Sequence, residues 1–141
     1  CGVSVNCSDV ARSAEWYQRA LALVAVNGEP MSSLWGPATA SHHLALAGQE
    51  HVFRISLEQR RSPTAPSRAY ASAHHVGIFR MAFIVTDIDE GYERLRSAGV
   101  EGFSPPVALD MGPEVPIDGL RALFFPDPDG ACLELIESVR G

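Results

Sequence analysis

The strongest constraint on the fold of this chain is an internal repeat with a fixed offset of 78 residues. Positions related by this offset carry residues of the same kind, with no gap between them: Val5 and Phe83, Asp9 and Asp87, Val10 and Ile88, Ile55 and Leu133, and Leu57 and Leu135. A repeat of this kind indicates one supersecondary unit that is present twice. In each copy the apolar runs and turn residues predict a strand, a helix and three further strands. The sequence therefore predicts an α+β fold built from two βαβββ modules.

The first copy carries local signals for each of these elements. Strands are predicted at residues 3–7, 23–26, 42–47 and 51–59. Ser8-Asp9 offers an N-cap to the helix after the first strand, in which apolar residues recur at helical spacing. Gly48 and Gln49 are expected to turn the chain between the last two strands, whereas residues 29–40 are expected to be irregular.

The second copy follows the same order. It predicts a strand at residues 81–85 and a helix that Thr86-Asp87 caps and Gly99 ends. Residues 101–118 contain four prolines and predict a long loop, which we expect to act as a lid over a site. A β-hairpin over residues 119–137 closes the chain.

The closing hairpin places one charged side chain inside an apolar strand. Its turn, residues 126–130, has the sequence Pro-Asp-Pro-Asp-Gly, in which proline presets φ, aspartate caps the bend and glycine accepts a positive φ. Glu134 lies between Leu133 and Leu135, so strand alternation puts the leucines on one face and the carboxylate on the other. A carboxylate that faces away from an apolar layer either meets solvent or serves a site.

This hairpin, together with the segments 5–17 and 84–95, resembles the vicinal oxygen chelate superfamily. That superfamily holds glyoxalase I, bleomycin-resistance proteins and extradiol dioxygenases, and the resemblance covers nearly the whole chain. It implies that two modules curl mixed sheets around one cleft. It also implies a single glyoxalase-like domain over residues 1–141, with module one at 1–60, a linker at 61–77 and module two at 78–141.

The resemblance further implies where a metal ion would bind. Superfamily metal sites use cleft-facing residues on the first and last strand of each module, mostly His on first strands and Glu on last strands. The matching positions here are Gly2, Ser56, Arg80 and Glu134. Arginine cannot ligate a metal, and its fixed positive charge repels a divalent cation. We therefore expect no metal, and either an ion pair between Arg80 and Glu134 or an Arg80 that binds an anionic or carbonyl oxygen of a ligand.

Strand alternation and the resemblance together give the residues expected to bind a ligand. They are Ser4, Asn6, Trp35, Ser56, His75, Arg80 and Glu134. Trp35 is suited to stack on a planar ligand, and His75 enters module two near the rim of the expected cleft. Arg54 and Glu58 share the face of Ser56, but we expect both to be solvated strand residues.

The remaining histidines, His42, His43, His51 and His74, occupy no position that the superfamily uses for a metal. Neighbouring histidines on a strand point to opposite faces, so each pair offers at most one side chain to a site. We expect these residues to be solvated or hydrogen-bonded. Cys132 is expected to be a small buried hydrophobe and not a nucleophile.

Composition excludes several kinds of partner. The net charge is −6 and no basic run is present, which argues against nucleic acid and against an anionic membrane surface. No apolar stretch approaches the roughly 20 residues of a membrane helix. The 3 cysteines form no CxxC motif and fit a reducing compartment. We therefore expect a cytoplasmic protein with a small-molecule ligand, and the resemblance implies a homodimer.

Two classes of function stay open. The first is a metal-free binding protein that sequesters a hydrophobic or aromatic compound, as the bleomycin-resistance branch does. The second is an enzyme. It would be a glyoxalase or dioxygenase with a divalent ion that polarises vicinal oxygens, or a metal-free isomerase or lyase with Glu134 as general base and Arg80 as enolate stabiliser. A neighbouring arginine stabilises the ionised carboxylate, and this weakens the metal-free enzyme hypothesis.

Overall fold

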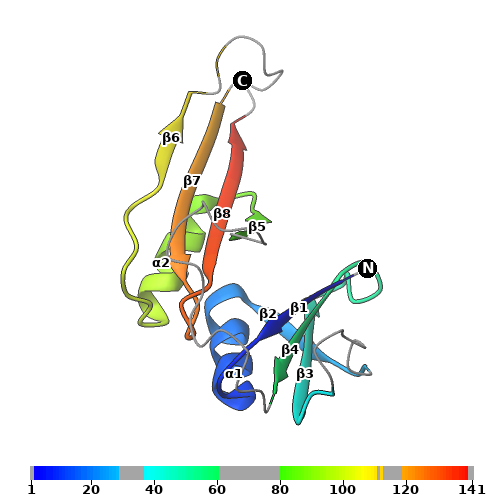
Figure 1. The fold of residues 1–141 in the computed structure, drawn as a ribbon. Coiled ribbons are helices and arrows are strands. Elements are labelled where there is room, and N and C mark those ends of the chain that lie inside the picture. The colour runs from blue at the N-terminus through cyan, green and yellow to red at the C-terminus, as the bar shows by residue number, and fades with distance from the viewer. Residues whose placement is uncertain (1, 29–36, 61–79, 111, 113–118, 140–141) are drawn as a thin grey trace. The chain divides into compact units, whose positions relative to one another are not determined.

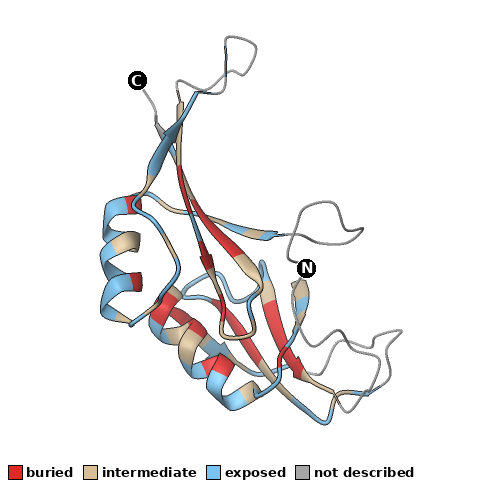
Figure 2. Ribbon diagram, turned by 60° about the vertical axis from the view of Figure 1, so that its left-hand side comes forward, coloured by how far each residue is buried: buried red, intermediate tan, exposed pale blue. Residues whose placement is uncertain are grey.

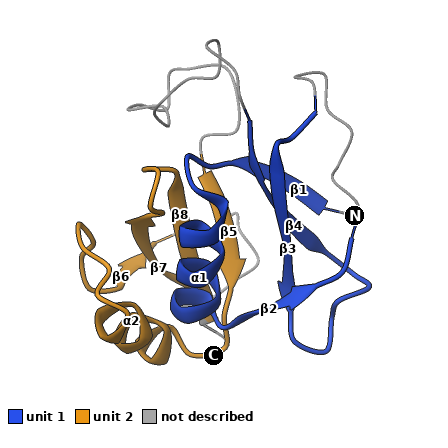
Figure 3. Ribbon diagram, turned by 90° about the horizontal axis from the view of Figure 1, so that it is seen from below, with its two compact units in different colours: residues 1–67 blue, residues 68–141 orange. Residues whose placement is uncertain are grey.

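The structure, a computed structural model, describes residues 2–28, 37–60, 80–110, 112 and 119–139 (Figure 1). The chain divides into two compact units, Cys1–Ser67 (unit 1) and Arg68–Gly141 (unit 2), which Figure 3 colours separately. Each unit holds one copy of the sequence repeat. The predicted linker at 61–77 and the irregular stretch 29–36 lie outside the described residues.

Unit 1 is a mixed sheet with a helix against it. Its described elements are β1 (Gly2–Asn6), α1 (Val10–Leu21), β2 (Leu23–Val26), β3 (Ala40–Leu46) and β4 (Arg54–Gln59). The strand order is β1-β4-β3-β2, in which β1 and β4 are parallel and the other neighbours are antiparallel. The parallel pair consists of β1 and β4, the first and last strands of the module. Parallel neighbours need a long connection, and here the helix and the two middle strands provide it.

Unit 2 repeats this topology. Its described elements are β5 (Arg80–Ile84), α2 (Ile88–Ser97), β6 (Val107–Leu109), β7 (Gly119–Pro126) and β8 (Cys132–Val139). The strand order is β5-β8-β7-β6, with β5 and β8 parallel. The two mixed sheets and their helices make an α+β fold, and the predicted strand–helix–three-strand order is confirmed in both units.

The strand register reproduces the sequence offset. Gly2 pairs with Arg54 in unit 1, and Arg80 pairs with Cys132 in unit 2. Both members of the second pair follow those of the first by 78 residues (80 − 2 and 132 − 54). The repeat is therefore a repeat of hydrogen-bonded structure as well as of sequence.

Each helix begins at a capping aspartate, as predicted. The side chains of Asp9 and Asp87 accept hydrogen bonds from the backbone N–H groups of Arg12, at 3.0 Å, and Glu90, at 2.9 Å. These bonds satisfy donors that the first helical turn leaves without a partner. Within the described residues no helix has the length and apolarity needed to cross a membrane.

The core of each unit lies between its helix and one face of its sheet (Figure 2). The largest fully buried apolar side chains are Tyr17, Leu44, Ile55 and Leu57 in unit 1 and Ile88, Leu95, Leu123 and Leu133 in unit 2. Burying one side chain of this size contributes about 1.5–3 kcal/mol. The helices cover one face of each sheet, so the other face carries the residues that alternate with the core.

Most predicted strand bounds differ from the structure by one or two residues, and two stretches differ by more. The last strand of unit 1 begins at Arg54, because hydrogen bonds from Gln49 N–H to Leu46 O and from Val52 N–H to Gln49 O fold residues 47–53 into consecutive turns. The long loop predicted over residues 101–118 contains the short strand β6, which pairs with β7. Residues 113–118 lie outside the described part of the chain, and the lid stays a prediction.

The turn of the closing hairpin has the predicted chemistry. The Asp127 side chain is 6% exposed, and its Oδ1 accepts hydrogen bonds from the backbone N–H groups of Asp129, at 2.9 Å, and Ala131, at 2.7 Å. Gly130 has φ +86°, the left-handed conformation that glycine adopts most readily. This turn sets the register in which β7 and β8 pair.

Replacing Asp127 by Ala should lower the free energy of unfolding by about 1–3 kcal/mol, because two backbone donors lose their acceptor. Chemical denaturation measures the loss. Asp110→Ala is the matched control, because the exposed Asp110 accepts from Gly112 N–H in a similar turn and should cost below about 1 kcal/mol. Equal losses for the two variants would contradict the role given to Asp127.

An ion-pair network ties α2 to its sheet. Arg121 on β7 donates to both carboxylate oxygens of Asp89 in the first turn of α2, each at 2.8 Å, and to Glu137 at 3.3 Å. The hydrogen bond from Arg121 holds the pKa of Asp89 below its usual value. A carboxylate whose pKa is lowered by folding stabilises the folded state above its ordinary pKa.

Asp89→Asn should therefore lower the melting temperature at pH 7. The difference in melting temperature between the variant and the unchanged protein should shrink as pH falls below about 3.9 and then through the lower pKa that Asp89 has in the folded state. Asp89 is then protonated in the unchanged protein and no longer carries the charge that the variant lacks. Thermal unfolding across this range measures the difference. Glu93→Gln, which breaks an exposed pair with Arg96 inside α2, is the control and should change less at pH 7. A difference that is constant with pH would contradict the assignment.

Candidate functional site

The open face of the unit 2 sheet, opposite α2, is organised around Glu134. Register puts its neighbours on the same face: Arg80, Ala82, Ile84, Ala122, Phe124, Cys132 and Ile136. Leu133 and Leu135 are buried on the other face, toward α2, so the predicted alternation is confirmed. Glu134 itself is only 2% exposed. A buried carboxylate needs a counter-charge or hydrogen-bond donors, and this requirement determines which residues gather around it.

Arg80 supplies the counter-charge. Its Nε lies 2.9 Å from Oε2 of Glu134, although the contact lacks the alignment of a hydrogen bond and acts as a charge–charge contact. The guanidinium carbon is also 5.5 Å from the centroid of the Phe124 ring, within cation–π range. The side chain of Arg80 is 49% exposed. One side of the guanidinium therefore faces a buried carboxylate while the rest is open to solvent.

Exposed apolar side chains surround this ion pair on the same face. Ile84 is 86% exposed, Val107 54% and Phe124 41%, and register places all three on the face of Glu134. Large side chains exposed together on one surface are typical of binding sites. Unit 2 thus combines an apolar surface with one polar centre.

The matching face of unit 1 is polar. Ser56, at the position that matches Glu134, is fully buried, and its Oγ lies 3.0 Å from Nδ1 of His43, which is 5% exposed. Asn6 is exposed and its Oδ1 accepts from Nε of Arg60 at 3.2 Å. Arg60 also forms an ion pair with Glu58. Serine, histidine, asparagine and an ion pair thus make one hydrogen-bonded surface.

On this face one prediction is wrong and one site residue was not predicted. Glu58 was expected to be solvated, but it is fully buried, because Arg60 neutralises its charge and is itself only 5% exposed. His43 was not among the predicted site residues, although it belongs to the face of Ser56. The register of β3 against β4, which pairs His43 with Ser56, is the missing information.

The other predicted ligand-binding residues fall into two groups. Ser4 lies on β1 with its side chain on the open face beside Asn6, where it is exposed. Trp35 and His75 lie outside the described residues. The roles given to Ser4, Asn6 and Ser56 in ligand binding stay predictions.

Cys132 is half-buried and pairs with Arg80 across the strands. Burial raises the pKa of the thiol, Arg80 opposes this shift, and Glu134 adds to it. A thiol with a raised pKa is protonated at neutral pH and is a poor nucleophile. Cys132 is less buried than predicted, but its chemistry fits the expectation that it is not a nucleophile.

The donors at the superfamily's metal positions do not fit a divalent ion. In unit 2 these positions hold Arg80 and Glu134, and the carboxylate already faces the guanidinium. In unit 1 they hold Gly2, which has no side chain, and Ser56, whose hydroxyl is hydrogen-bonded to His43. Among the residues that the structure describes, no group of three or more His, Cys, Asp or Glu side chains is placed to hold a metal.

The fold and the hairpin define the class of protein. The model of the Glyoxalase/Bleomycin resistance protein/Dioxygenase superfamily matches residues 3–135, so the chain belongs to that superfamily. This confirms the resemblance drawn from the closing hairpin and the two repeated segments. No curated protein was found to match the sequence.

Solved structures share the fold at low sequence identity. A glyoxylase/bleomycin resistance protein/dioxygenase domain from Frankia sp. EAN1pec has a TM-score of 0.70 at 24% identity, with 99% of this chain and 91% of that chain covered. A glyoxalase family protein from Enterococcus faecalis has a TM-score of 0.70 at 23% identity, with coverages of 96% and 94%. The fosfomycin resistance protein FosX from Mesorhizobium loti has a TM-score of 0.60 at 16% identity, with coverages of 99% and 91%.

Replacing Arg80 by Met should lower the free energy of unfolding by about 1–3 kcal/mol, because Glu134 is left buried without its counter-charge. The double variant Arg80→Met/Glu134→Gln should recover most of this loss, since no charge remains to be buried. Chemical denaturation of the two single variants and the double variant measures the coupling.

Arg96→Met is the matched control for this cycle. Arg96 pairs with Glu93 on the surface of α2, with both side chains more than half exposed, so its loss should cost below about 1 kcal/mol. A double variant that is no more stable than Arg80→Met would show that the ion pair does not govern the burial of Glu134.

Proposed function

We propose that the protein binds a small, planar, hydrophobic compound on the open face of the unit 2 sheet, without a metal ion. The observation that supports this proposal best is the Arg80–Glu134 ion pair beside the exposed ring of Phe124. This arrangement favours binding and sequestration, as in the bleomycin-resistance branch, over metal-dependent catalysis.

The apolar part of the proposed ligand is assigned to the exposed side chains. Phe124 presents a ring that is 41% exposed, and Ile84 presents a side chain that is 86% exposed. A planar compound that covers them removes apolar surface from water, at about 25 cal/mol per Å². Stacking on the Phe124 ring adds an aromatic contact.

Arg80 gives the proposed site its polar specificity. A guanidinium carries five N–H donors, and the contact with Glu134 involves Nε. The exposed part of the side chain is suited to donate to a carbonyl or anionic oxygen at the edge of a planar ligand. Glu134 holds the guanidinium in place and so reduces the entropy that the arginine loses on binding.

The metal-free enzyme is the weaker hypothesis. A general base must reach the proton that it abstracts, but Glu134 is 2% exposed and faces Arg80.

One solved structure with this fold is named as a fosfomycin resistance protein, and this agrees with a protein that acts on a small molecule. A homodimer and a cytoplasmic location stay predictions.

Phe124→Ala should weaken the binding of a planar aromatic dye about ten-fold, because an aromatic contact worth about 1.4 kcal/mol is lost. Anilinonaphthalene sulfonate is a suitable probe, since its fluorescence reports transfer to an apolar surface and its sulfonate can contact Arg80. Arg80→Ala should weaken binding as well. Fluorescence titration of the folded protein measures both changes.

Phe53→Ala is the matched control, since Phe53 in unit 1 is 39% exposed and Phe124 41%. Equal losses for the two phenylalanine variants, or no saturable binding of the dye, would contradict the proposed site. So would a stoichiometric divalent ion in protein purified without added metal, measured by elemental analysis, because the ligand would then have a metal to bind.

A further inference from the structure

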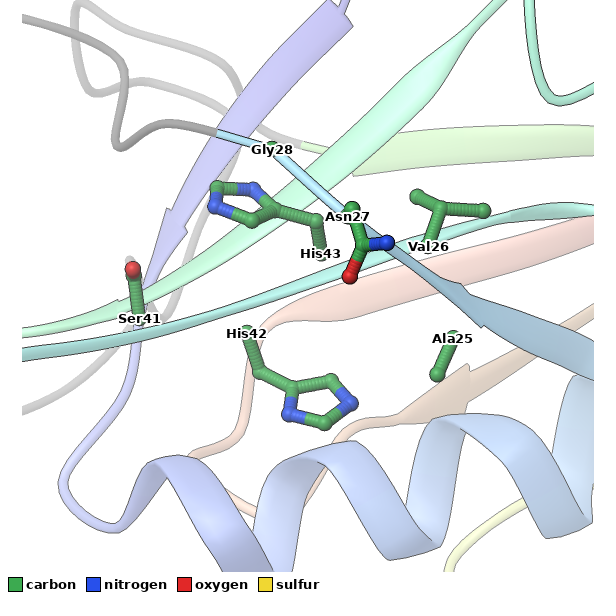
Figure 4. A pocket seen from close by; sticks show the side chains of 7 residues that line it. All are labelled: Ala25, Val26, Asn27, Gly28, Ser41, His42 and His43. Carbon is green, nitrogen blue, oxygen red and sulfur yellow. The ribbon is translucent and has the colours of Figure 1, made fainter.

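A pocket lies in unit 1, where β2 ends and β3 begins (Figure 4). Its volume is about 490 Å³, within the range of about 300–1,000 Å³ that small-molecule sites occupy. Ala25 and Val26 give the lining an apolar part, and Asn27, Ser41 and His43 give it hydrogen-bonding groups. Figure 4 shows the two neighbouring histidines, His42 and His43, on opposite sides of β3.

A guanidinium meets the wall of this pocket at Gly28. A methyl group placed on Gly28 would overlap Nη1 of Arg54 and would lie 3.0 Å from its Cζ and 3.2 Å from Cδ2 of His43. The absence of a side chain on Gly28 thus allows the arginine and the histidine to lie against the same stretch of backbone. Gly28 and His43 both line the pocket, so the positive charge of Arg54 lies directly behind its lining.

Arg54 differs from the other strand-associated arginines. Arg60, Arg80 and Arg121 each form an ion pair with a carboxylate. In the described parts of the chain Arg54 has no such carboxylate, and its buried Nε has no hydrogen-bond partner. A partly buried guanidinium without an acceptor is costly, and bound anions commonly supply the missing acceptor.

The other charges on this face do not oppose an anion. Glu58 lies on the same face of β4, two residues from Ser56, but Arg60 neutralises it. Asn27 and Ser41 are neutral, and their side-chain N–H and O–H groups can donate hydrogen bonds to a negatively charged ligand. The described surroundings of the pocket therefore hold one unpaired positive charge, that of Arg54.

We infer that this pocket binds a small organic anion, specifically a carboxylate attached to a compact apolar body. The carboxylate accepts hydrogen bonds from the Asn27 and Ser41 side chains of the lining, and the positive charge of Arg54, which lies beside Gly28 behind the lining, favours its binding. The apolar body rests on Val26, which the strand register places on the face of His43. This site is distinct from the one proposed in unit 2 and does not depend on it.

Benzoate and benzamide test this inference, since they share a shape and differ in charge. Titration of the full chain, followed by NMR, should show benzoate binding with shifts at the backbone amides of Asn27 and Gly28, and benzamide binding at least about ten-fold more weakly. Arg54→Gln should weaken benzoate binding about ten-fold or more. The Arg54→Gln spectrum also shows whether the variant is folded.

Two further variants separate this site from general charge effects and from the unit 2 site. Arg19→Gln makes the same change in net charge on the exposed face of α1, where Arg19 pairs with Glu15, and should leave benzoate affinity unchanged. Arg80→Ala should leave the shifts at Asn27 and Gly28 unchanged, although it removes any benzoate binding at the unit 2 site. Equal affinity for benzoate and benzamide at Asn27 and Gly28, a folded Arg54→Gln variant with full benzoate affinity there, or shifts at these two residues that depend on Arg80 would each overturn the inference.

Discussion

A buried carboxylate needs a nearby cation or hydrogen-bond donors to remain charged, and the demand for a cation shapes the open face of both sheets. Glu134 in unit 2 is paired with Arg80, which comes from the neighbouring parallel strand. Glu58 in unit 1 is paired with Arg60, which follows it by two residues, just beyond the end of β4. The two modules share a fold and a need for neutralisation, but they meet that need with arginines from different places. Both pairs lie on the sheet faces where the superfamily resemblance implies a metal ion.

Much of the fold could be predicted because its signals are local. The capping aspartates and the hairpin turn at Asp127 each follow from a few neighbouring residues, and the offset of 78 residues shows in the sequence when its two halves are compared. The repeat predicts a strand before the closing hairpin, but the position of β6 could not be predicted, because Val107–Leu109 is exposed throughout and shows no alternation of buried and exposed residues. Its position depends on pairing with β7, which is a tertiary contact.

The candidate site was predictable to a similar extent. The meeting of Arg80 and Glu134 was predicted from the superfamily resemblance, which implies that these first-strand and last-strand positions face one site. The contact of His43 with Ser56 does not follow, because it depends on how many residues the turns after Leu46 use before β4 begins. Burial of Glu58 was missed for a related reason: Arg60 lies just beyond the strand, where alternation no longer predicts direction.

Each unit carries the counter-ion for its own buried glutamate. Arg60 and Glu58 both belong to the first half of the chain, whereas Arg80 and Glu134 both belong to the second. A gene rearrangement that exchanged halves between copies would therefore leave each of these two glutamates with its own arginine.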